Sequence, residues 1–388
     1  MITALVNGRI LTDDGFVDGR SVLLEHGRIK AIADARAARD AGRIHDLEGQ
    51  LLLPGFIDAQ VNGGGGVLFN DDPSVDAIVE IGRVHRRYGT TGFLPTLISD
   101  DLATVARAVQ ATRAAIEGGV PGVLGIHIEG PFLNAERKGV HDASKLRALD
   151  ERALGLLTSL GGGRTLVTLA PEMTTPDMIR KLSNAGVIVS AGHTNATYAE
   201  VKVAIEHGLI GFTHLFNAMS QLTGREPGVV GAALDDPNTW CGIILDGRHV
   251  DPVVLRIALR SKRHDRFMLV TDAMPSVGTG QTTFTLQGRR ITVEGYACVD
   301  HEGRLAGTHL DMGASVRNAR AMLQVGTIEA VRMASLYPAT FLRLDDELGR
   351  IAPGHRANFV VADSALNVTD TWIDGHPAES CQSLVTSS

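Results

Sequence analysis

Five residues that can bind a metal or carry a proton stand at or just beyond the ends of short apolar runs. They are Glu129 in GIHIEGP, His193 in SAGHTNAT, His214 in GFTHLFN, His249 in IILDGRHV and Asp272 in LVTDAMP. Each alone has an ordinary explanation, such as a hydrogen-bonded loop histidine, a turn glutamate or a helix-capping aspartate. The same placement at five run ends favours one shared site.

The residue types indicate which chemistry such a site would perform. One carboxylate and two neutral imidazoles commonly hold a catalytic divalent metal, and Glu129, His193 and His214 are the candidate ligands. We expect one ion per chain, Zn²⁺ by default, although Fe²⁺ and other divalent ions suit the same ligands. Asp272 is the candidate for taking a proton from water and passing it to a leaving group. His249 is the candidate for stabilising an oxyanion.

The periodicity of the chain predicts how these residues meet. From Phe56 onward, apolar runs alternate with segments of helical spacing. The eight runs are FIDAQV, TGFLPTL, VLGIHIEG, TLVTLAPE, GVIVSAGHT, GFTHLFN, WCGIILDG and FMLVTDAM. Eight such units over about 280 residues predict an α/β fold, a TIM-like (β/α)8 barrel, with a doubly wound open sheet as the alternative. Barrel strands open their C-terminal ends onto one face, where distant residues converge.

β-like segments flank the predicted barrel. Residues 1–53 and 336–388 each hold too few strands to bury a face alone, so we expect one small β-sandwich formed from both chain ends. The barrel is predicted over residues 54–335, with a β-hairpin insertion near 280–305. The polar tail AESCQSLVTSS is expected to be frayed.

The composition argues against some classes of partner and indicates a cellular compartment. The chain has 388 residues and a formal net charge of -7, which gives no basic surplus for nucleic acid or an anionic membrane surface. It shows no basic, apolar signal-peptide start and no apolar run of about 18 residues. Cys241, Cys298 and Cys381 are too few and too far apart for a disulfide framework. We therefore expect a cytoplasmic protein without nucleic-acid or membrane partners.

Two predicted loops carry candidate substrate-binding residues. NAMSQLTGREPG, after the sixth run, places Asn217 and Arg225 near the open face of the predicted barrel. The guanidinium of Arg225 suits a phosphate, and an exposed surface arginine is an equal alternative. GPFLNAERKGVHD carries His141 either over the site or in an ordinary surface loop.

Taken together, the motifs resemble those of the N-acetylglucosamine-6-phosphate deacetylases, a branch of the amidohydrolase superfamily. The resemblance runs nearly end to end, through LLLPGFIDAQVNGGGG, HIEGPFLN, KGVH, SAGHTNAT, THLFNAM, LDGRHV, LVTDAM and LAGT. LPGFID marks only the wider superfamily, whereas HIEGPFLN with AGHTNAT and THLFNAM is specific to this branch.

The resemblance implies hydrolysis of the N-acetyl group of N-acetyl-D-glucosamine 6-phosphate, with an amino-sugar phosphate as the small-molecule partner. It implies metal ligation by Glu129, His193 and His214, and acid–base work by Asp272. It also implies a homodimer, in which Arg225 reaches the neighbouring subunit's site. The residues that match sugar-phosphate contacts of similar enzymes are Val140, His141, Asn217, Ala218, Arg225, His249, Leu305, Ala306 and Gly307.

One position departs from many amidohydrolases, which carry His-x-His at the end of the first strand. Here that place reads Gln60-Val61-Asn62. Amides are weak ligands for zinc-like ions, so we predict a single metal, with Gln60 and Asn62 orienting water or the metal site.

Alternative functions remain at this point. The nearest is the same hydrolysis on another N-acetyl hexosamine phosphate, a cyclic amide or an N-acyl amino acid. A non-catalytic sugar-phosphate-binding regulator and a phosphosugar isomerase are alternatives of other classes.

Overall fold

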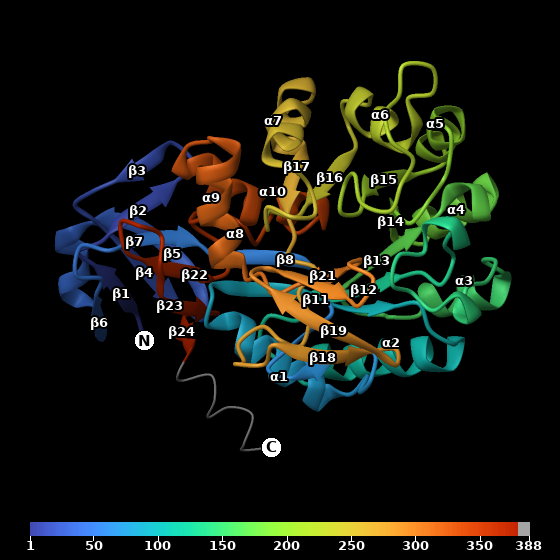
Figure 1. The fold of residues 1–388 in the computed structure, drawn as a ribbon. Helices are drawn as coiled ribbons and strands as arrows, with labels where there is room; N and C mark the ends of the chain where they lie inside the picture. The colour runs from blue at the N-terminus through green and yellow to red at the C-terminus, as the bar shows by residue number, and fades with distance from the viewer. Residues whose placement is uncertain (379–388) are drawn as a thin grey trace. The chain divides into compact units, whose positions relative to one another are not determined.

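The computed structural model describes residues 1–378 and groups them into two compact units (Figure 1). One unit comprises residues 1–58, 85–92 and 312 onward, and the other comprises residues 59–84 and 93–311. Residues 379–388, including Cys381 and nearly all of the tail expected to be frayed, lie outside the described range. Within residues 1–378, no helix has both the length and the apolar character needed to cross a membrane.

The central sheet has eight parallel strands in the order β17-β16-β15-β14-β13-β12-β11-β8. It closes where the chain after β17 meets β8, because Val61 and Ala273 form a parallel bridge and the Asp272 N–H donates to the Gln60 carbonyl at 3.0 Å. The predicted (β/α)8 barrel is therefore confirmed. Its strands are β8 (Phe56–Val61), β11 (Thr90–Ile98), β12 (Gly125–Glu129), β13 (Arg164–Leu169), β14 (Ile188–Ala191), β15 (Leu209–Phe212), β16 (Trp240–Ile243) and β17 (Phe267–Leu269).

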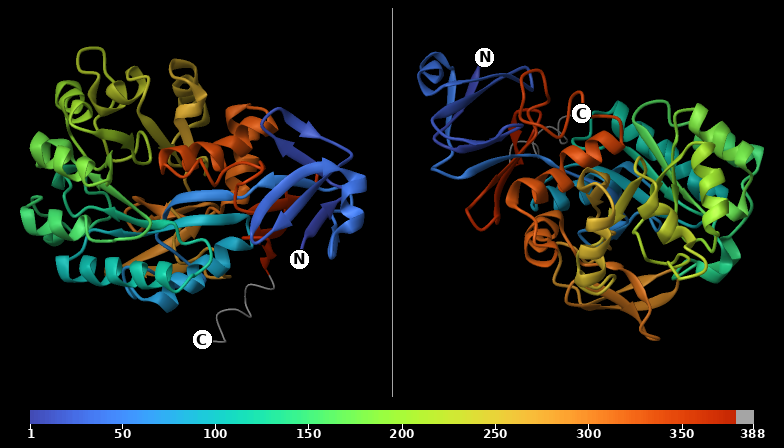
Figure 2. Two further views of the ribbon diagram at one scale, coloured as in Figure 1. Left: turned by 180° about the vertical axis from the view of Figure 1, so that it is seen from behind. Right: turned by 90° about the horizontal axis from the view of Figure 1, so that it is seen from above.

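Helices lie on the outside of this sheet, as Figure 2 shows. Several begin at a residue whose side chain accepts a backbone N–H, such as Asp150, Thr175 and Asp251, and Thr197 forms a capping box with Glu200. The helices are α1 (Val75–Arg86), α2 (Leu102–Glu117), α3 (Glu151–Leu157), α4 (Pro176–Asn184), α5 (Tyr198–Glu206), α6 (Gly228–Asp235) and α7 (Pro252–Ser261). Short 3-10 helices lie in the loops between these strands and helices: η2 (Ala135–Arg137), η3 (Ala143–Lys145), η4 (Pro171–Met173) and η5 (His264–Arg266).

A four-stranded antiparallel sheet occupies the region where the sequence suggested a hairpin insertion. Its strands, in order, are β18 (Thr283–Leu286), β19 (Arg289–Glu294), β20 (Ala297–Asp300) and β21 (Leu305–Thr308). A smaller pair, β9 (Gly63–Gly64) and β10 (Val67–Leu68), follows β8. Buried residues of the four-stranded sheet pack with Leu68, Ile98, Val140 and Met274, so the sheet shares a core with barrel residues.

The other unit contains two sheets, of which one is formed by N-terminal strands and the other by strands from both ends of the chain. Their strand orders are β5-β4-β1-β6 and β24-β23-β22-β7-β2-β3. Pro54 pairs with Phe359, and Trp372 packs in one core with Leu5 and Leu52, which confirms the predicted sandwich. The strands are β1 (Thr3–Val6), β2 (Arg9–Thr12), β3 (Gly15–Val17), β4 (Arg20–Glu25), β5 (Arg28–Asp34), β6 (Arg43–Asp46), β7 (Leu51–Pro54), β22 (Phe359–Ala362), β23 (Val368–Ile373) and β24 (His376–Pro377).

The helices of this unit are η1 (Ala35–Asp40), α8 (Met312–Asn318), η6 (Ala319–Leu323), α9 (Thr327–Ala334) and α10 (Leu336–Phe341). Residues 312–335 belong to the same compact unit as the sandwich strands. The domain boundaries expected at residues 53/54 and 335/336 stay predictions.

Candidate active site

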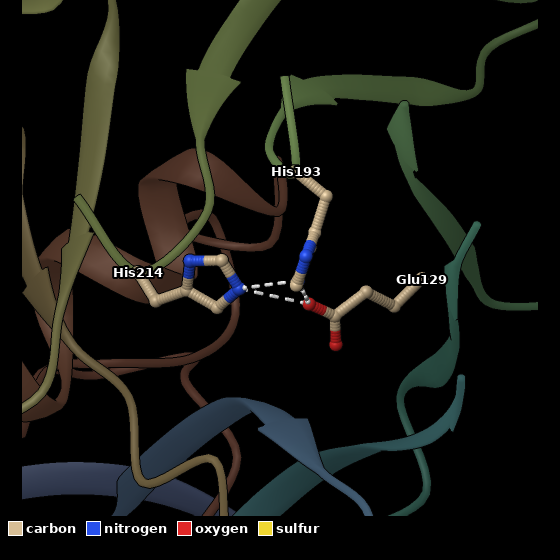
Figure 3. A group of neighbouring side chains, drawn as sticks. All are labelled: Glu129, His193 and His214. Carbon is tan, nitrogen blue, oxygen red and sulfur yellow. Dashed lines mark hydrogen bonds and ion pairs between the residues drawn. The ribbon is translucent and has the colours of Figure 1, made fainter. Parts of the chain in front are cut away.

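Three side chains predicted as metal ligands lie together beyond the ends of barrel strands (Figure 3). Glu129 is the last residue of β12, and His193 and His214 each follow their strands, β14 and β15, by two residues. Glu129 Oε1 lies 3.0 Å from His193 Nε2 and 2.9 Å from His214 Nε2. The two Nε2 atoms are 3.0 Å apart, and all three side chains are buried.

The hydrogen bonds of His193 indicate whether the cluster of Glu129, His193 and His214 suits a cation. His193 Nδ1 lies 2.9 Å from the carbonyl oxygen of Arg137, so Nδ1 carries the proton and Nε2 presents a lone pair to Glu129. An imidazole lone pair and a carboxylate oxygen in contact repel each other unless a cation lies between them. Glu129, His193 and His214 therefore fit a divalent metal such as zinc.

Three residues of the site have an unusual backbone conformation. His193, His214 and Asp272 have φ values of 50°, 33° and 53°, in a region that residues other than glycine seldom occupy. Strained backbone of this kind concentrates at functional sites, where the surrounding fold holds it in place.

Asp272 lies beside the cluster, held by two amides. Asn62 Nδ2 donates to Asp272 Oδ1 at 2.7 Å, and Gln60 Nε2 donates to the same oxygen at 3.2 Å and to Glu129 Oε2 at 3.1 Å. Burial, followed by the nearby negative charge of Glu129, raises the pKa of Asp272 to about 6. Gln60 therefore bridges the two carboxylates with its amide hydrogens.

His249 is oriented by a carboxylate that the sequence analysis did not single out. Asp246 Oδ2 lies 2.6 Å from His249 Nδ1, while Asp246 Oδ1 accepts the backbone N–H groups of Arg248 and His249. Burial opposes ionisation of Asp246, but the hydrogen bond from His249 lowers its pKa. Nδ1 therefore donates to Asp246, and Nε2 is left for other partners. The D-x-x-H spacing in LDGRHV could have indicated the pairing of Asp246 with His249.

His141 is a neutral donor with a fixed tautomer. The backbone N–H of Ser99 donates to His141 Nδ1 at 3.3 Å, and Ser99 Oγ lies 2.7 Å from the same atom. Burial, together with the nearby His193, lowers the pKa of His141 well below its usual value. Nδ1 therefore accepts, and the proton resides on Nε2.

A cavity of about 320 Å³ lies over these groups. Gln60 and Asn62 do not line it, Ala306 is buried in the adjoining core, and Arg225 lies in an exposed loop away from it. The residues singled out from the sequence that line the cavity are Glu129, Val140, His141, His193, His214, Asn217, Ala218, His249, Asp272, Leu305 and Gly307.

Two cationic side chains at the cavity were missed by the sequence analysis. Arg137 and Arg304 line the cavity, and Arg304 also pairs with Glu302. Both stand in charged loop segments, ERK and HEGR, that read as ordinary solvent-exposed turns. Their sequence carried no signal of proximity to the site.

A buried polar chain beneath the metal-ligand cluster was also missed. His127 Nδ1 lies 3.2 Å from Thr96 Oγ1, and His127 Nε2 lies 2.8 Å from Thr168 Oγ1. Thr168 Oγ1 lies 2.6 Å from Thr213 Oγ1, which donates a hydrogen bond to Ser190 Oγ at 3.0 Å. Burial lowers the pKa of His127 to about 4, so it is neutral at physiological pH. The chain joins β11 to β14 just below the ligands.

The barrel, the buried Glu-His-His group and the neighbouring aspartate agree with the comparison to known proteins. Residues 51–378 match the profile of the amidohydrolase family. The chain belongs to this family.

Relatives of this amidohydrolase cover nearly all of its length. It is 42% identical to an N-acetylgalactosamine-6-phosphate deacetylase of Shewanella sp. (strain ANA-3), over 95% of this chain and 93% of the relative. It is 36% identical to an N-acetylglucosamine-6-phosphate deacetylase of Haemophilus influenzae, over 96% of this chain and 98% of the relative. The crystal structure of N-acetylglucosamine-6-phosphate deacetylase from Pasteurella multocida superposes with a TM-score of 0.94 at 36% identity, covering 97% of this chain and 99% of that one.

Proposed function

We propose that this amidohydrolase removes the acetyl group from N-acetyl-D-glucosamine 6-phosphate, giving D-glucosamine 6-phosphate and acetate. The observation that carries the proposal is the meeting of Glu129, His193, His214 and Asp272 at one cavity. Deacetylases of amino-sugar 6-phosphates are similar to the chain along nearly its whole length, which supports the substrate class.

A second substrate, N-acetyl-D-galactosamine 6-phosphate, has specific support. The Shewanella relative is named for that substrate and is 42% identical to this chain, against 36% for the Haemophilus enzyme. The two sugars differ only in the configuration at C4, so the same amide-cleaving groups serve both. Discrimination between them would depend on the residues that contact the C4 hydroxyl.

In the proposed mechanism, Glu129, His193 and His214 hold one divalent metal, Zn²⁺, which supplies a Lewis acid for amide hydrolysis. Asp272 takes a proton from the attacking water and returns it to the leaving nitrogen. His249, held by Asp246, stabilises the oxyanion of the tetrahedral intermediate. Gln60 and Asn62 orient Asp272 and, with their weakly ligating amides, limit the site to one metal.

The remaining cavity residues are assigned to sugar and phosphate contacts. His141 offers its Nε2–H as a donor, and the loop carrying Asn217 and Ala218 forms another part of the wall. The other proposed contacts are Val140, Leu305 and Gly307 at the cavity surface, with Ala306 packed behind them.

We also propose a cytoplasmic homodimer. Arg225 is exposed and lies outside the cavity of its own chain, which agrees with a phosphate contact in a neighbouring subunit's site. Helix α7 exposes Val253, Val254 and Ile257, which form an apolar face of the kind that subunit contacts bury.

The test is acetate release by purified protein from the 6-phosphates of N-acetylglucosamine and N-acetylgalactosamine, with unphosphorylated N-acetylglucosamine as the matched control. Each reaction is run before chelation, after chelation and after zinc is restored, alongside a metal count per chain. We expect chelator-sensitive release from a 6-phosphate, weak release from the free sugar and about one metal per chain, as for catalytic zinc sites with three protein ligands. Failure of both 6-phosphates with metal present would overturn the proposal.

A further inference from the structure

A carboxylate outside the cavity ties together two segments that meet at the metal-ligand cluster. Glu172, in η4, accepts hydrogen bonds from Asn134 Nδ2 at 2.9 Å, from Thr194 Oγ1 at 2.5 Å and from the Asn195 backbone N–H at 2.6 Å. Asn134 belongs to the loop after β12, whereas Thr194 and Asn195 directly follow His193. Glu172 thus joins a cavity loop to the segment that carries a candidate metal ligand.

The same two segments also contact each other directly. The Asn134 N–H donates to the His193 carbonyl at 3.0 Å, and the Arg137 carbonyl accepts His193 Nδ1–H at 2.9 Å. Arg137 Nε donates to Asn195 Oδ1 at 2.6 Å. The orientation of the His193 ring therefore depends on the backbone of the loop at Arg137.

The loop that orients His193 also forms one wall of the cavity. Residues 134–141 include Arg137, Val140 and His141, all of which line it. The rings of His141 and His193 lie 4.4 Å apart, centroid to centroid. Movement of this loop would thus disturb a cavity wall and a ligand ring together.

We propose that Glu172 is a positioning residue that locks loop 134–141 to segment 193–195, so that metal affinity and the order of this loop depend on each other. The inference rests on one part of the proposed function, namely that Glu129, His193 and His214 bind a divalent metal. A carboxylate is suited to the task because it accepts from donors on both segments at once, and such charge-assisted bonds are strong. Coupling of this kind is reciprocal, so the loop stabilises metal binding by the factor by which the metal stabilises the loop.

Two measurements test the proposal without using catalysis. Zinc affinity is measured by competition with a chromogenic chelator, and hydrogen exchange of the peptide spanning residues 132–142 is followed with and without zinc. The variants are Glu172→Ala, Glu172→Gln and the control Glu117→Ala, which removes an exposed carboxylate at the end of α2.

We expect Glu172→Ala to weaken zinc binding about 10- to 100-fold, the usual range for groups that orient a metal ligand. Glu172→Gln should lose roughly 3-fold, because one oxygen still accepts from Asn134 and Asn195 while the amide faces the Thr194 hydroxyl. In the wild type, loop exchange should rise on chelation, and in Glu172→Ala it should be raised with zinc bound. Glu117→Ala should match the wild type in both measurements.

Wild-type zinc affinity in both Glu172 variants would overturn the proposal, as would wild-type loop exchange that does not respond to zinc. If Glu172→Ala does not fold, Glu172→Gln and the wild-type exchange decide the matter. Absence of acetate release with normal coupling would reject the proposed function and leave this inference standing. Absence of zinc binding by the wild type would reject the proposed metal site.

Discussion

The floor and the rim of the cavity are built in different ways. The floor comprises Glu129, His193, His214 and Asp272, which are buried and stand at or just after barrel strands. The rim comprises loop 134–141 and the segment 303–307, where charged side chains such as Arg304 are exposed. Under the proposed function, the barrel positions the groups that cleave the bond, and the rim contacts the substrate. The predictions below change the floor first and the rim last.

The largest effect is expected at Asp272 on the floor. Asp272→Asn removes the proton acceptor but keeps the shape, so kcat should fall about 1000-fold while zinc remains bound. Wild-type activity should fall on acidification, because Asp272 must be ionised to accept a proton. Its pKa is about 6, and a bound cation would lower it, so the acidic limb should lie at or below pH 6. A pH profile of kcat and a metal count check this, and retention of most of the rate would reject the assignment.

The next effect is expected at the pair formed by His249 and Asp246. His249→Asn should lower kcat about 100-fold, which is the usual loss for one oxyanion-stabilising donor. Asp246→Asn should cost less, because the imidazole remains but loses the carboxylate that orients its ring. Steady-state kinetics should place both losses in kcat. An effect confined to KM would indicate that His249 only binds the substrate.

Below the floor, His127 should influence stability more than catalysis. His127→Leu interrupts the polar chain and should lower the free energy of unfolding by about 1–3 kcal/mol, measured by urea denaturation of the metal-free protein. The folded-state pKa of about 4 is below the ordinary value of 6.5, so between these values the unfolded chain binds a proton that the native chain does not. Stability should therefore fall as the pH drops from 6.5 to 4, and the leucine variant should lose this part of the pH dependence.

The smallest effects are expected at Arg304 on the rim and at Arg225, which lies outside the cavity of its own chain. Arg304→Gln and Arg225→Gln each remove one cation, and each should raise KM for the 6-phosphate by less than about 10-fold, as for exposed charge pairs. Arg304 lines the cavity of its own chain and Arg225 does not. A larger KM effect from Arg225 would therefore indicate that a second copy supplies it, whereas a larger effect from Arg304 would assign phosphate binding to the same chain. Unphosphorylated substrate is the control.

The floor residues could be predicted from the sequence because each combines a side chain that can bind a metal or carry a proton with a position at or just beyond the end of an apolar run. Glu129, His193 and His214 each end an apolar run, and barrel topology then requires that they meet. The orienting groups could not be placed in this way. Glu172 and Arg137 act through loop geometry and a backbone carbonyl, which leave no spacing pattern in the sequence. His127 reads as one more buried strand residue, although its ring joins several strands.

The sandwich of the other unit has a consequence for synthesis of the chain. Leu52 and Pro54 of β7 pair with Val361 and Phe359 of β22, so their partners are translated after the whole barrel. The β22 side of β7 must remain unpaired while the ribosome makes the intervening residues, whereas the other N-terminal strands pair with one another. Long-range pairing of this kind forms late and leaves strand edges open in the meantime. A ribosome-stalled chain ending before β22 should therefore leave the edge of β7 exposed and available to chaperones.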